Sequence, residues 1–242
     1  MKKANWMLVI LGVCLFLSVI VSNLILRHQF NKIDKSDPFW NYTKLASGPF
    51  HHIMLSGSNK TRVVFSPSRT GSVGVLNIWE SELRERVQAS IARDTLFVHM
   101  NDRADPPNLR EWMKYRVLIA ISAPDIYSAH ARDANLDMSK MKQRSIAIDL
   151  SGKSRMEFES YISDFDSLSI VERDSSELKF EMADELGDFN ILHARSIRSN
   201  VNGYSFLNIG HFQIQSFHPV IGDSSAIAVS GGTLRILKNQ TF

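Results

Sequence analysis

One short stretch of the chain matches part of the phosphate-binding loop motif. Gly152, Lys153 and Ser154 reproduce the end of the pattern G-x-x-x-x-G-K-[ST], in which backbone N–H groups wrap a phosphate. The pattern also needs a glycine five positions before Gly152, and the chain has Ala147 there. A phosphate loop opens a helix, whereas residues 155–159 alternate polar and apolar side chains with the two-residue period of a strand. The sequence therefore argues against a nucleotide site and predicts a tight turn between two strands.

Histidine is the next residue type that could hold a ligand, because its imidazole is the commonest metal ligand in proteins. Seven histidines follow residue 50: His51, His52, His99, His130, His193, His211 and His218. No pair has the i, i+4 spacing that places two ligands on one helix face, and the chain has no C-x-x-C pair. We therefore predict no metal site and no cofactor.

Acidic residues cluster at two places, and some β-helical enzymes that cleave polysaccharides use such clusters as acid and base. The clustered residues are Asp164, Asp166, Asp184, Glu185 and Asp188. Both clusters fall in segments typical of turns, where aspartate bonds its own backbone. The chain also has no G-x-S-x-G elbow for a nucleophilic serine. We expect no catalytic residues, and a polysaccharide-active enzyme that uses these acids is the alternative.

Aromatic and asparagine side chains offer two further interpretations that involve sugars. A sugar-stacking strip could be built from Trp40, Trp79, Trp112, Tyr115, Tyr127, Tyr161 and Tyr204. Packing in a core or an interface is the simpler role for such rings. The N-x-T triplets at Asn41, Asn59 and Asn239 accept glycans only in a eukaryotic secretory route, which nothing else in the sequence indicates.

Short strands are the elements expected to position nearly all of these side chains. Period-two alternation predicts strands at residues 62–65, 72–76, 95–98, 115–120, 130–136, 145–150, 167–171, 189–194, 206–209 and 226–229. The one helical candidate after residue 49 is the segment 80–88, where Leu83 and Val87 lie at i, i+4 on one face.

Small polar turns separate the strands beyond residue 124. Ser151-Gly152 precedes a second alternating run at 156–158, Ser175-Ser176 precedes one at 178–180, and Gly231-Gly232 precedes one at 234–237. A strand, a small-residue turn and another strand, repeated without helices, is typical of a parallel β-helix. An antiparallel sandwich also has many short strands. We predict the all-β solenoid and assign the Ser151–Ser154 stretch to one of its turns.

The N-terminus carries a long apolar segment at residues 6–26, which contains no charged side chain. About 21 residues in a helix span about 31 Å, close to the hydrocarbon core of a bilayer at about 30 Å. A cleaved signal peptide is the alternative, but its apolar region is usually shorter and followed by small residues, whereas this one ends in Leu24, Ile25 and Leu26. Lipidation at Cys14 is disfavoured because Val13 stands where a small residue is expected.

Domain organisation follows from this segment. We predict a cytoplasmic tail at residues 1–5, a transmembrane helix at 6–26, a juxtamembrane linker at 27–48 and a β-helical domain at 49–242. The positive-inside rule does not decide the orientation, because lysine and arginine flank both ends of the span. Cys14 is the single cysteine, so no disulfide can form within the chain.

The charge composition argues against a nucleic-acid partner. The chain has 28 lysine and arginine residues against 25 acids, for a formal net charge of +3. The basic residues are dispersed, and no basic run is interleaved with aromatic residues. We therefore expect no nucleic acid among its partners.

The residues at the start of the β-rich region resemble a known family. The stretch from Phe50 through Ile53 to Ser56-Gly57 is similar to the opening F-x-x-I-x-x-S-G of the "putative autotransporter adhesin, head GIN domain" family of Bacteroidetes-type envelope proteins. The resemblance continues through residues 94–98 and Pro124 to the repeated turns, and covers roughly residues 49–237. It implies a right-handed parallel β-helix, export from the cytoplasm and no established catalytic residues.

Together these features predict a noncatalytic, single-pass protein of the bacterial inner membrane. Residues 6–26 would contact the lipid bilayer, and the C-terminal domain would lie in the periplasm, where it binds a glycan or an envelope protein. Exposed strand edges at the ends of a solenoid favour homo-oligomers. A sensor that signals through the span is a weaker alternative, because residues 1–5 offer little chain for signalling.

Overall fold

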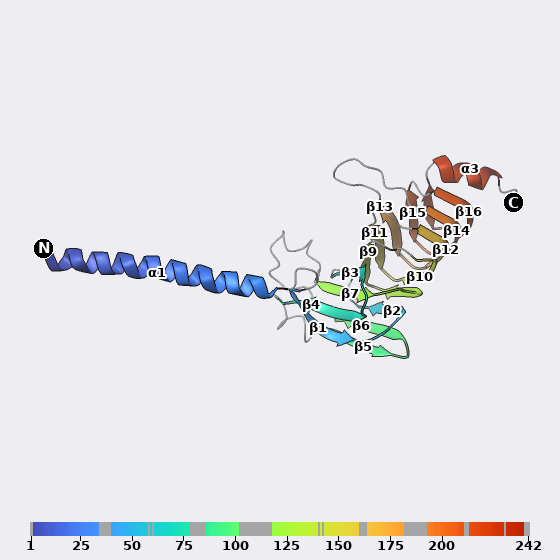
Figure 1. The fold of residues 1–242 in the computed structure, drawn as a ribbon. Coiled ribbons are helices and arrows are strands. Elements are labelled where there is room, and N and C mark those ends of the chain that lie inside the picture. Colours follow the sequence, from blue (N-terminus) through green and yellow to red (C-terminus); the bar gives the residue numbers. More distant parts are fainter. Residues whose placement is uncertain are drawn as a thin grey trace. The chain divides into compact units, whose positions relative to one another are not determined.

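The chain forms two units, an N-terminal helix and a β-rich domain. The computed structural model describes residues 2–33, 40–57, 59, 61–77, 86–101, 118–139, 141, 143–159, 164–181, 193–210, 213–229 and 231–239. The first unit covers Met1–Asn41 and the second covers Tyr42–Phe242 (Figure 1).

Helix α1 (Lys2–Lys32) makes up the first unit. Its stretch Val9–Lys32 has a mean hydropathy of 2.7 and is long and apolar enough to cross a membrane. The predicted span at residues 6–26 lies within α1. The helix continues through residues 27–32, which the sequence placed in the linker.

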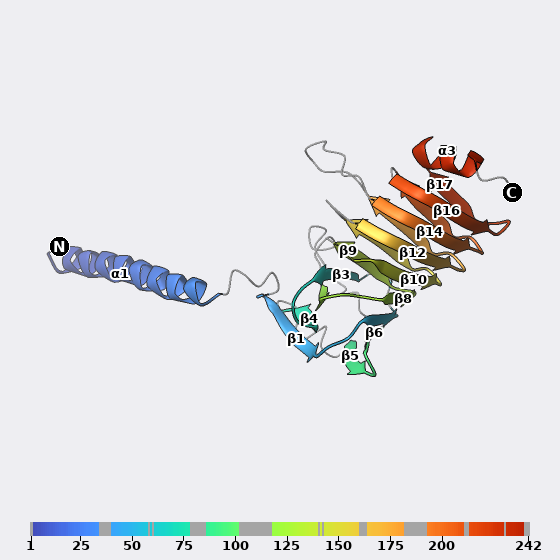
Figure 2. The same cartoon turned by 45° about the vertical axis from the view of Figure 1, so that its right-hand side comes forward.

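Two sheets build the second unit. Counted over the described residues, the nine-stranded sheet has the order β1 (Tyr42–Ser47), β4 (Ser72–Leu76), β7 (Ile119–Ala123), β3 (Arg62–Pro67), β9 (Asn135–Ser139), β11 (Arg155–Glu159), β13 (Glu177–Glu181), β15 (Phe206–Gly210) and β17 (Ala226–Val229). The eight-stranded sheet has the order β16 (Gln213–Ile221), β14 (His193–Val201), β12 (Asp164–Glu172), β10 (Ser145–Ser151), β8 (Ser128–Arg132), β2 (His52–Ser56), β6 (Thr95–Met100) and β5 (Val87–Ala92). Figure 2 shows β10, β12, β14 and β16 following one another in steps toward helix α3 (Gly231–Asn239).

The predicted all-β, right-handed parallel β-helix is wrong, because the chain forms a mixed fold. The pairs β1–β4, β4–β7 and β5–β6 are antiparallel, whereas the other strand pairs, including all those from β8 to β17, are parallel. The β5–β6 reversal is a two-residue turn at Arg93 and Asp94, with φ angles of 47° and 66°. Two successive positive φ angles characterise the hairpin turn that matches strand twist. The antiparallel β5–β6 pair therefore arises from a turn that contains no glycine.

The predicted strand at residues 234–237 is also wrong, because these residues belong to helix α3. Thr233 is buried, and Ile236 and Leu237 pack against the core. These three positions follow the i, i+3, i+4 spacing of one helix face. A four-residue alternation is too short to distinguish that spacing from a strand.

Several other predicted elements need correction. The single strand at 130–136 is divided into β8 and β9 by a turn at Asp133, whose φ is 50°. Strand β1 lies within the segment 27–48 that was predicted to be a linker. Residues 87 and 88 of the predicted helix belong to β5, and residues 80–85, 115–117 and 189–192 lie outside the described part of the chain.

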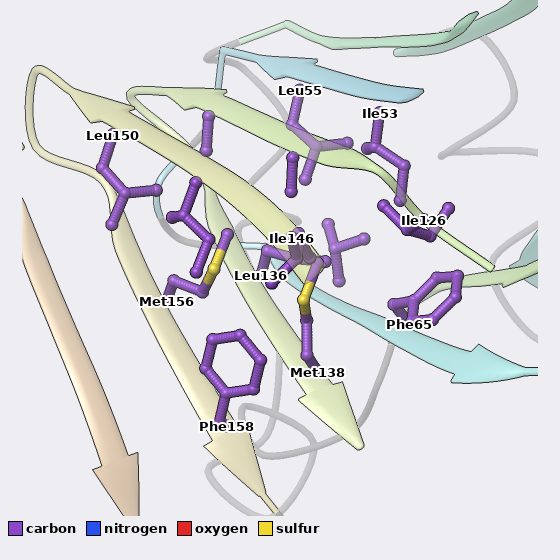
Figure 3. Packing of buried hydrophobic residues seen from close by; sticks show 14 of the residues in the cluster. Ile53, Leu55, Phe65, Ile126, Leu136, Met138, Ile146, Leu150, Met156 and Phe158 are labelled. Carbon is purple, nitrogen blue, oxygen red and sulfur yellow. The ribbon is translucent and has the colours of Figure 1, made fainter. Parts of the chain in front are cut away.

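The core lies between the two sheets and is built from side chains in register. Ile146, Leu168, Ile197 and Phe217 occupy matching inward positions on β10, β12, β14 and β16. Figure 3 shows Ile146 and Leu150 pointing toward Leu136 and Met156 of the facing sheet. Each fully buried aliphatic or aromatic side chain contributes about 1.5–3 kcal/mol relative to an exposed one.

Buried serines line the turns between the sheets. Ser154, Ser176 and Ser205 are each 1% exposed. The Ser154 hydroxyl donates to the Ser151 carbonyl at 2.7 Å, and the hydroxyls of Ser176 and Ser205 lie 3.2 Å apart. Gly152 has a φ of 66°, which favours glycine. The resemblance of Gly152-Lys153-Ser154 to a phosphate loop is therefore explained by a turn, as the sequence predicts.

Candidate ligand groove

The outer face of the eight-stranded sheet carries a groove of about 700 Å³. It crosses β5, β6, β2, β8 and β10 and reaches the residue after β12. Its lining residues are Met54, Leu55, Ser56, Gln88, Ala89, Ser90, Phe97, Val98, His99, His130, Ala131, Arg132, Asp149, Ser151 and Arg173. We refer to this set as the groove.

Two large apolar side chains are exposed in the groove. Met54 is 45% exposed and Phe97 is 40% exposed, and the two residues are direct partners in the β2–β6 register. Their neighbours Leu55 and Val98 point inward and are buried, so the alternation of each strand directs Met54 and Phe97 outward. Each strand thus presents an apolar side chain to solvent where a polar one is usual.

Charged side chains stand beside this apolar pair. Asp149 Oδ1 accepts a hydrogen bond from Arg173 Nη2, and Asp149 Oδ2 lies 3.6 Å from His130 Nδ1. His130 is in register with both Met54 and Asp149. The groove therefore places an apolar surface next to a carboxylate that is paired with Arg173 and lies near His130.

The remaining histidines close to the groove bond to neighbouring side chains. His51 Nδ1 lies 2.8 Å from Asp94 Oδ1, and its ring stacks on Tyr127 with centroids 4.7 Å apart. His52 Nδ1 lies 2.8 Å from the Ser128 hydroxyl. Among the described residues, no group of three His, Cys, Asp or Glu side chains gathers as a metal site.

The clustered acids of the sequence are only partly described. Asp166 is exposed and lies 3.3 Å from Arg195, beside a second hollow of about 590 Å³. The side chain of Asp164 lies outside the described set, as do residues 184, 185 and 188. The enzyme alternative requires these acids to lie together in one groove, and the described residues do not test that arrangement.

The aromatic and asparagine candidates are dispersed. Trp40, Tyr127 and Tyr204 are exposed, whereas residues 79, 112, 115 and 161 lie outside the described part of the chain, as does residue 211 of the histidine set. Asn41 directly precedes β1, Asn239 ends α3, and the Asn59 amide donates to the Lys153 carbonyl at 3.4 Å. None of the described candidates lines the groove.

Glu172 is a buried acid that the sequence did not reveal. It is 0% exposed at the end of β12, between Leu150 and Val201 in the register of the sheet. Among the described residues, neither carboxyl oxygen has a hydrogen-bond partner of normal geometry. Burial raises the pKa of Glu172 to about 8, and the negative charge of Glu177 adds to the rise, while the backbone N–H of Leu178 opposes part of it. The side chain is therefore neutral over most of the physiological pH range.

The groove residues were missed because their proximity depends on pairing between distant strands. Met54 and His130 are 76 positions apart in the sequence, and His130 and Asp149 are 19 positions apart. The three residues are nevertheless neighbours in one row of the sheet. The local sequence offered one signal: each of the segments 52–56 and 95–100 has apolar residues on both faces of its strand. That signal indicates an exposed apolar patch only after the buried face is known.

Comparisons with known proteins give structural neighbours of low similarity. No family model matches the chain, and no curated protein matches it. The chain is similar to a "putative adhesin" from Bacteroides fragilis, with 11% identity, coverage of 78% of this chain and 96% of that chain, and a TM-score of 0.40. It is also similar to a "putative lipid binding protein" from Parabacteroides distasonis, with 12% identity, coverage of 78% and 96%, and a TM-score of 0.39.

A third neighbour is a "putative adhesin" from Parabacteroides merdae, with 11% identity, coverage of 78% and 95%, and a TM-score of 0.32. Two of these three neighbours are named putative adhesins, and no match to the head GIN domain family accompanies them. Identity and TM-score at this level assign neither a ligand nor an activity to this chain.

Proposed function

We propose that this chain is a membrane-anchored, noncatalytic binding protein of the bacterial cell envelope, with a head GIN-like domain. Helix α1 would hold it in the bilayer through residues 6–26, and the groove would bind its ligand. The observation that carries this proposal is the exposed Met54–Phe97 pair within a hollowed sheet face. Exposed apolar side chains gathered in a concavity mark interaction sites more often than side chains scattered singly.

The proposed location is the inner membrane, with the β-rich domain in the periplasm. We expect protease added to spheroplasts to digest the β-rich domain of the full chain while a cytosolic control protein remains intact. The readout is an immunoblot for a C-terminal epitope tag. Protection of the tag until the inner membrane is permeabilised would reverse the orientation and overturn the envelope assignment.

The groove is tested by removing its apolar floor. The double variant Met54→Ala, Phe97→Ala is expected to bind about tenfold more weakly to the cell-envelope glycan and protein fraction, because burying two such side chains contributes well over 1.4 kcal/mol. Binding is measured by co-sedimentation of the full chain in neutral detergent. Both side chains are exposed, so the thermal unfolding midpoint should change little.

The matched control is the double variant Tyr204→Ala, Val220→Ala, which removes two exposed apolar side chains that do not line the groove. It should bind as the original chain does. Equal losses in the two double variants would mean that the groove is not the site.

A further inference from the structure

The two outer sheet faces differ in their charge. On the nine-stranded sheet six described charged side chains form ion pairs with one another: Arg62 with Asp137, Arg155 with Glu157 and Glu177, and Lys179 with Glu177. These three cations and three carboxylates balance. Lys44 on β1 is exposed and has no carboxylate partner among the described residues, so this sheet retains one unpaired cation.

The outer face of the eight-stranded sheet carries an excess of cations. Its described carboxylates, Asp149 and Asp166, are already paired with Arg173 and Arg195. Arg132 on β8 and Arg198 on β14 are exposed and have no carboxylate partner among the described residues. A guanidinium group is always charged and suits a carboxylate or another oxyanion.

Histidines gather on the same sheet. The described histidines of the β-rich domain all lie on the eight-stranded sheet or directly before it, and His52, His99, His130, His193 and His218 occupy five different strands. Each of these five stands at an outward position, next to an inward neighbour that is buried. Imidazole donates hydrogen bonds to anions and carries a positive charge when protonated.

The two unpaired arginines lie on different rows of the sheet. Arg132 lines the groove, while Arg198 pairs in register with His218 on one side and Ser169 on the other. The row of Arg198 reaches β8 at Ser128, four residues before Arg132, so a line that joins the two arginines crosses the strands obliquely. The serines 145, 167, 196 and 216 form one row on β10, β12, β14 and β16. Adjacent strands are about 4.8 Å apart, so these hydroxyl groups recur at short intervals across the sheet.

We propose that the ligand of the groove is an acidic polysaccharide whose chain lies across the strands of the eight-stranded sheet. This inference rests on the proposed function and assigns its ligand class. The arginines and histidines match the acid groups, and the serine hydroxyls, with Gln88 and Ser90 of the groove, match sugar hydroxyls. Met54 and Phe97 match the apolar face of a sugar ring. A flat anionic membrane fits a hollowed face less well than an extended chain does.

The test measures binding of the full chain, in neutral detergent, to polygalacturonate, dextran sulfate and uncharged dextran. We expect binding to an acidic polymer and weak binding to dextran. The double variant Arg132→Gln, Arg198→Gln should bind the acidic polymer about tenfold more weakly, which corresponds to about 1.4 kcal/mol. Raising the salt concentration from 50 to 500 mM should weaken binding of the original chain more than binding of this variant.

The control double variant Arg69→Gln, Arg235→Gln removes the same charge from two exposed positions outside the eight-stranded sheet. It should bind the acidic polymer as the original chain does. An equal loss of binding in both double variants would mean that only the net charge of the protein matters, and it would overturn the inference.

Other outcomes separate the ligand class from the proposed function. Tight binding to dextran that Arg132→Gln and Arg198→Gln leave unchanged would overturn the acidic ligand, while the groove would still be a binding site. Stronger binding to phosphatidylglycerol vesicles than to either acidic polymer would replace the polysaccharide with a membrane surface. Failure to bind any of these probes would also overturn the inference. The proposed function is decided independently, by whether Met54→Ala and Phe97→Ala weaken binding to the envelope fraction.

Discussion

Replacing Glu172 with glutamine is expected to stabilise the β-rich domain strongly at pH 8 and to leave its stability at pH 5 nearly unchanged. Glu172 is 0% exposed, and its carboxyl oxygens have no hydrogen-bond partner of normal geometry within the described part of the chain. Burial raises its pKa from 4.5 to about 8, because an ionised carboxylate is costly in an apolar interior. Glutamine resembles the protonated acid in shape and has no charge to gain.

The sign of the pH dependence follows from the direction of the shift. The folded chain holds the Glu172 proton more tightly than the unfolded chain, so this group favours folding fully below about pH 4.5. As the pH rises from about 4.5 to about 8, the unfolded chain releases the proton first and the stability falls. One pKa unit corresponds to about 1.4 kcal/mol, so the loss approaches about 5 kcal/mol at pH 8.

The measurement is urea unfolding of the full chain in neutral detergent at pH 5, 6, 7 and 8. The difference in free energy of unfolding between Glu172→Gln and the original chain should grow with pH. Val201→Ala provides the control, since Val201 is buried beside Glu172 in the sheet register and does not titrate. It should lower stability equally at every pH. A difference for Glu172→Gln that stays constant from pH 5 to pH 8 would show that this carboxyl titrates normally.

Glu172 illustrates what the sequence could not reveal. It directly follows the predicted strand 167–171, and strand ends are usual places for acids at the surface. In the structure it takes the inward position after Leu168 and Ile170, so the two-residue period continues one step further than a polar residue suggests. Whether alternation or polarity prevails at the end of a strand depends on the turn that follows.

Local pattern predicted the individual strands better than their arrangement. Runs such as 145–150 and 206–209 alternate clearly, and the structure has β10 and β15 there. The direction of pairing is a different matter, because it depends on turns such as Arg93-Asp94 that lack the usual glycine signal. The antiparallel hairpin of β5 and β6 was therefore not predicted from the repeats.

The groove was the least predictable feature, because the sequence of a single strand does not determine its register with the neighbouring strands. Asp149 could be assigned from the sequence to an outward position of its strand, and so could His130. Their approach within 3.6 Å requires the parallel β8–β10 pairing. The unpaired charge of Arg132 likewise becomes visible only when the partners of all neighbouring acids are known.

Replacing Gly57 with alanine is expected to destabilise the β-rich domain by about 3 kcal/mol or more. Gly57 ends the stretch that resembles the F-x-x-I-x-x-S-G opening, and its φ is 114°, a backbone conformation that side chains rarely adopt. A Cβ atom built there would lie 1.7 Å from the Met100 carbonyl oxygen. Backbone cannot rotate away as a side chain can, so β2 and β6 would have to separate behind the groove.

The same methyl group can be added where space is open. Gly232 in α3 has no atom within 4 Å of a built Cβ, and alanine favours a helix over glycine by up to about 1 kcal/mol. Gly232→Ala should therefore be as stable as the original chain or slightly more stable in thermal unfolding, whereas Gly57→Ala should unfold at a clearly lower temperature. Equal thermal unfolding midpoints for the two variants would mean that β2 and β6 do not approach each other at Gly57. The register that pairs Met54 with Phe97 in the groove would then be wrong as well.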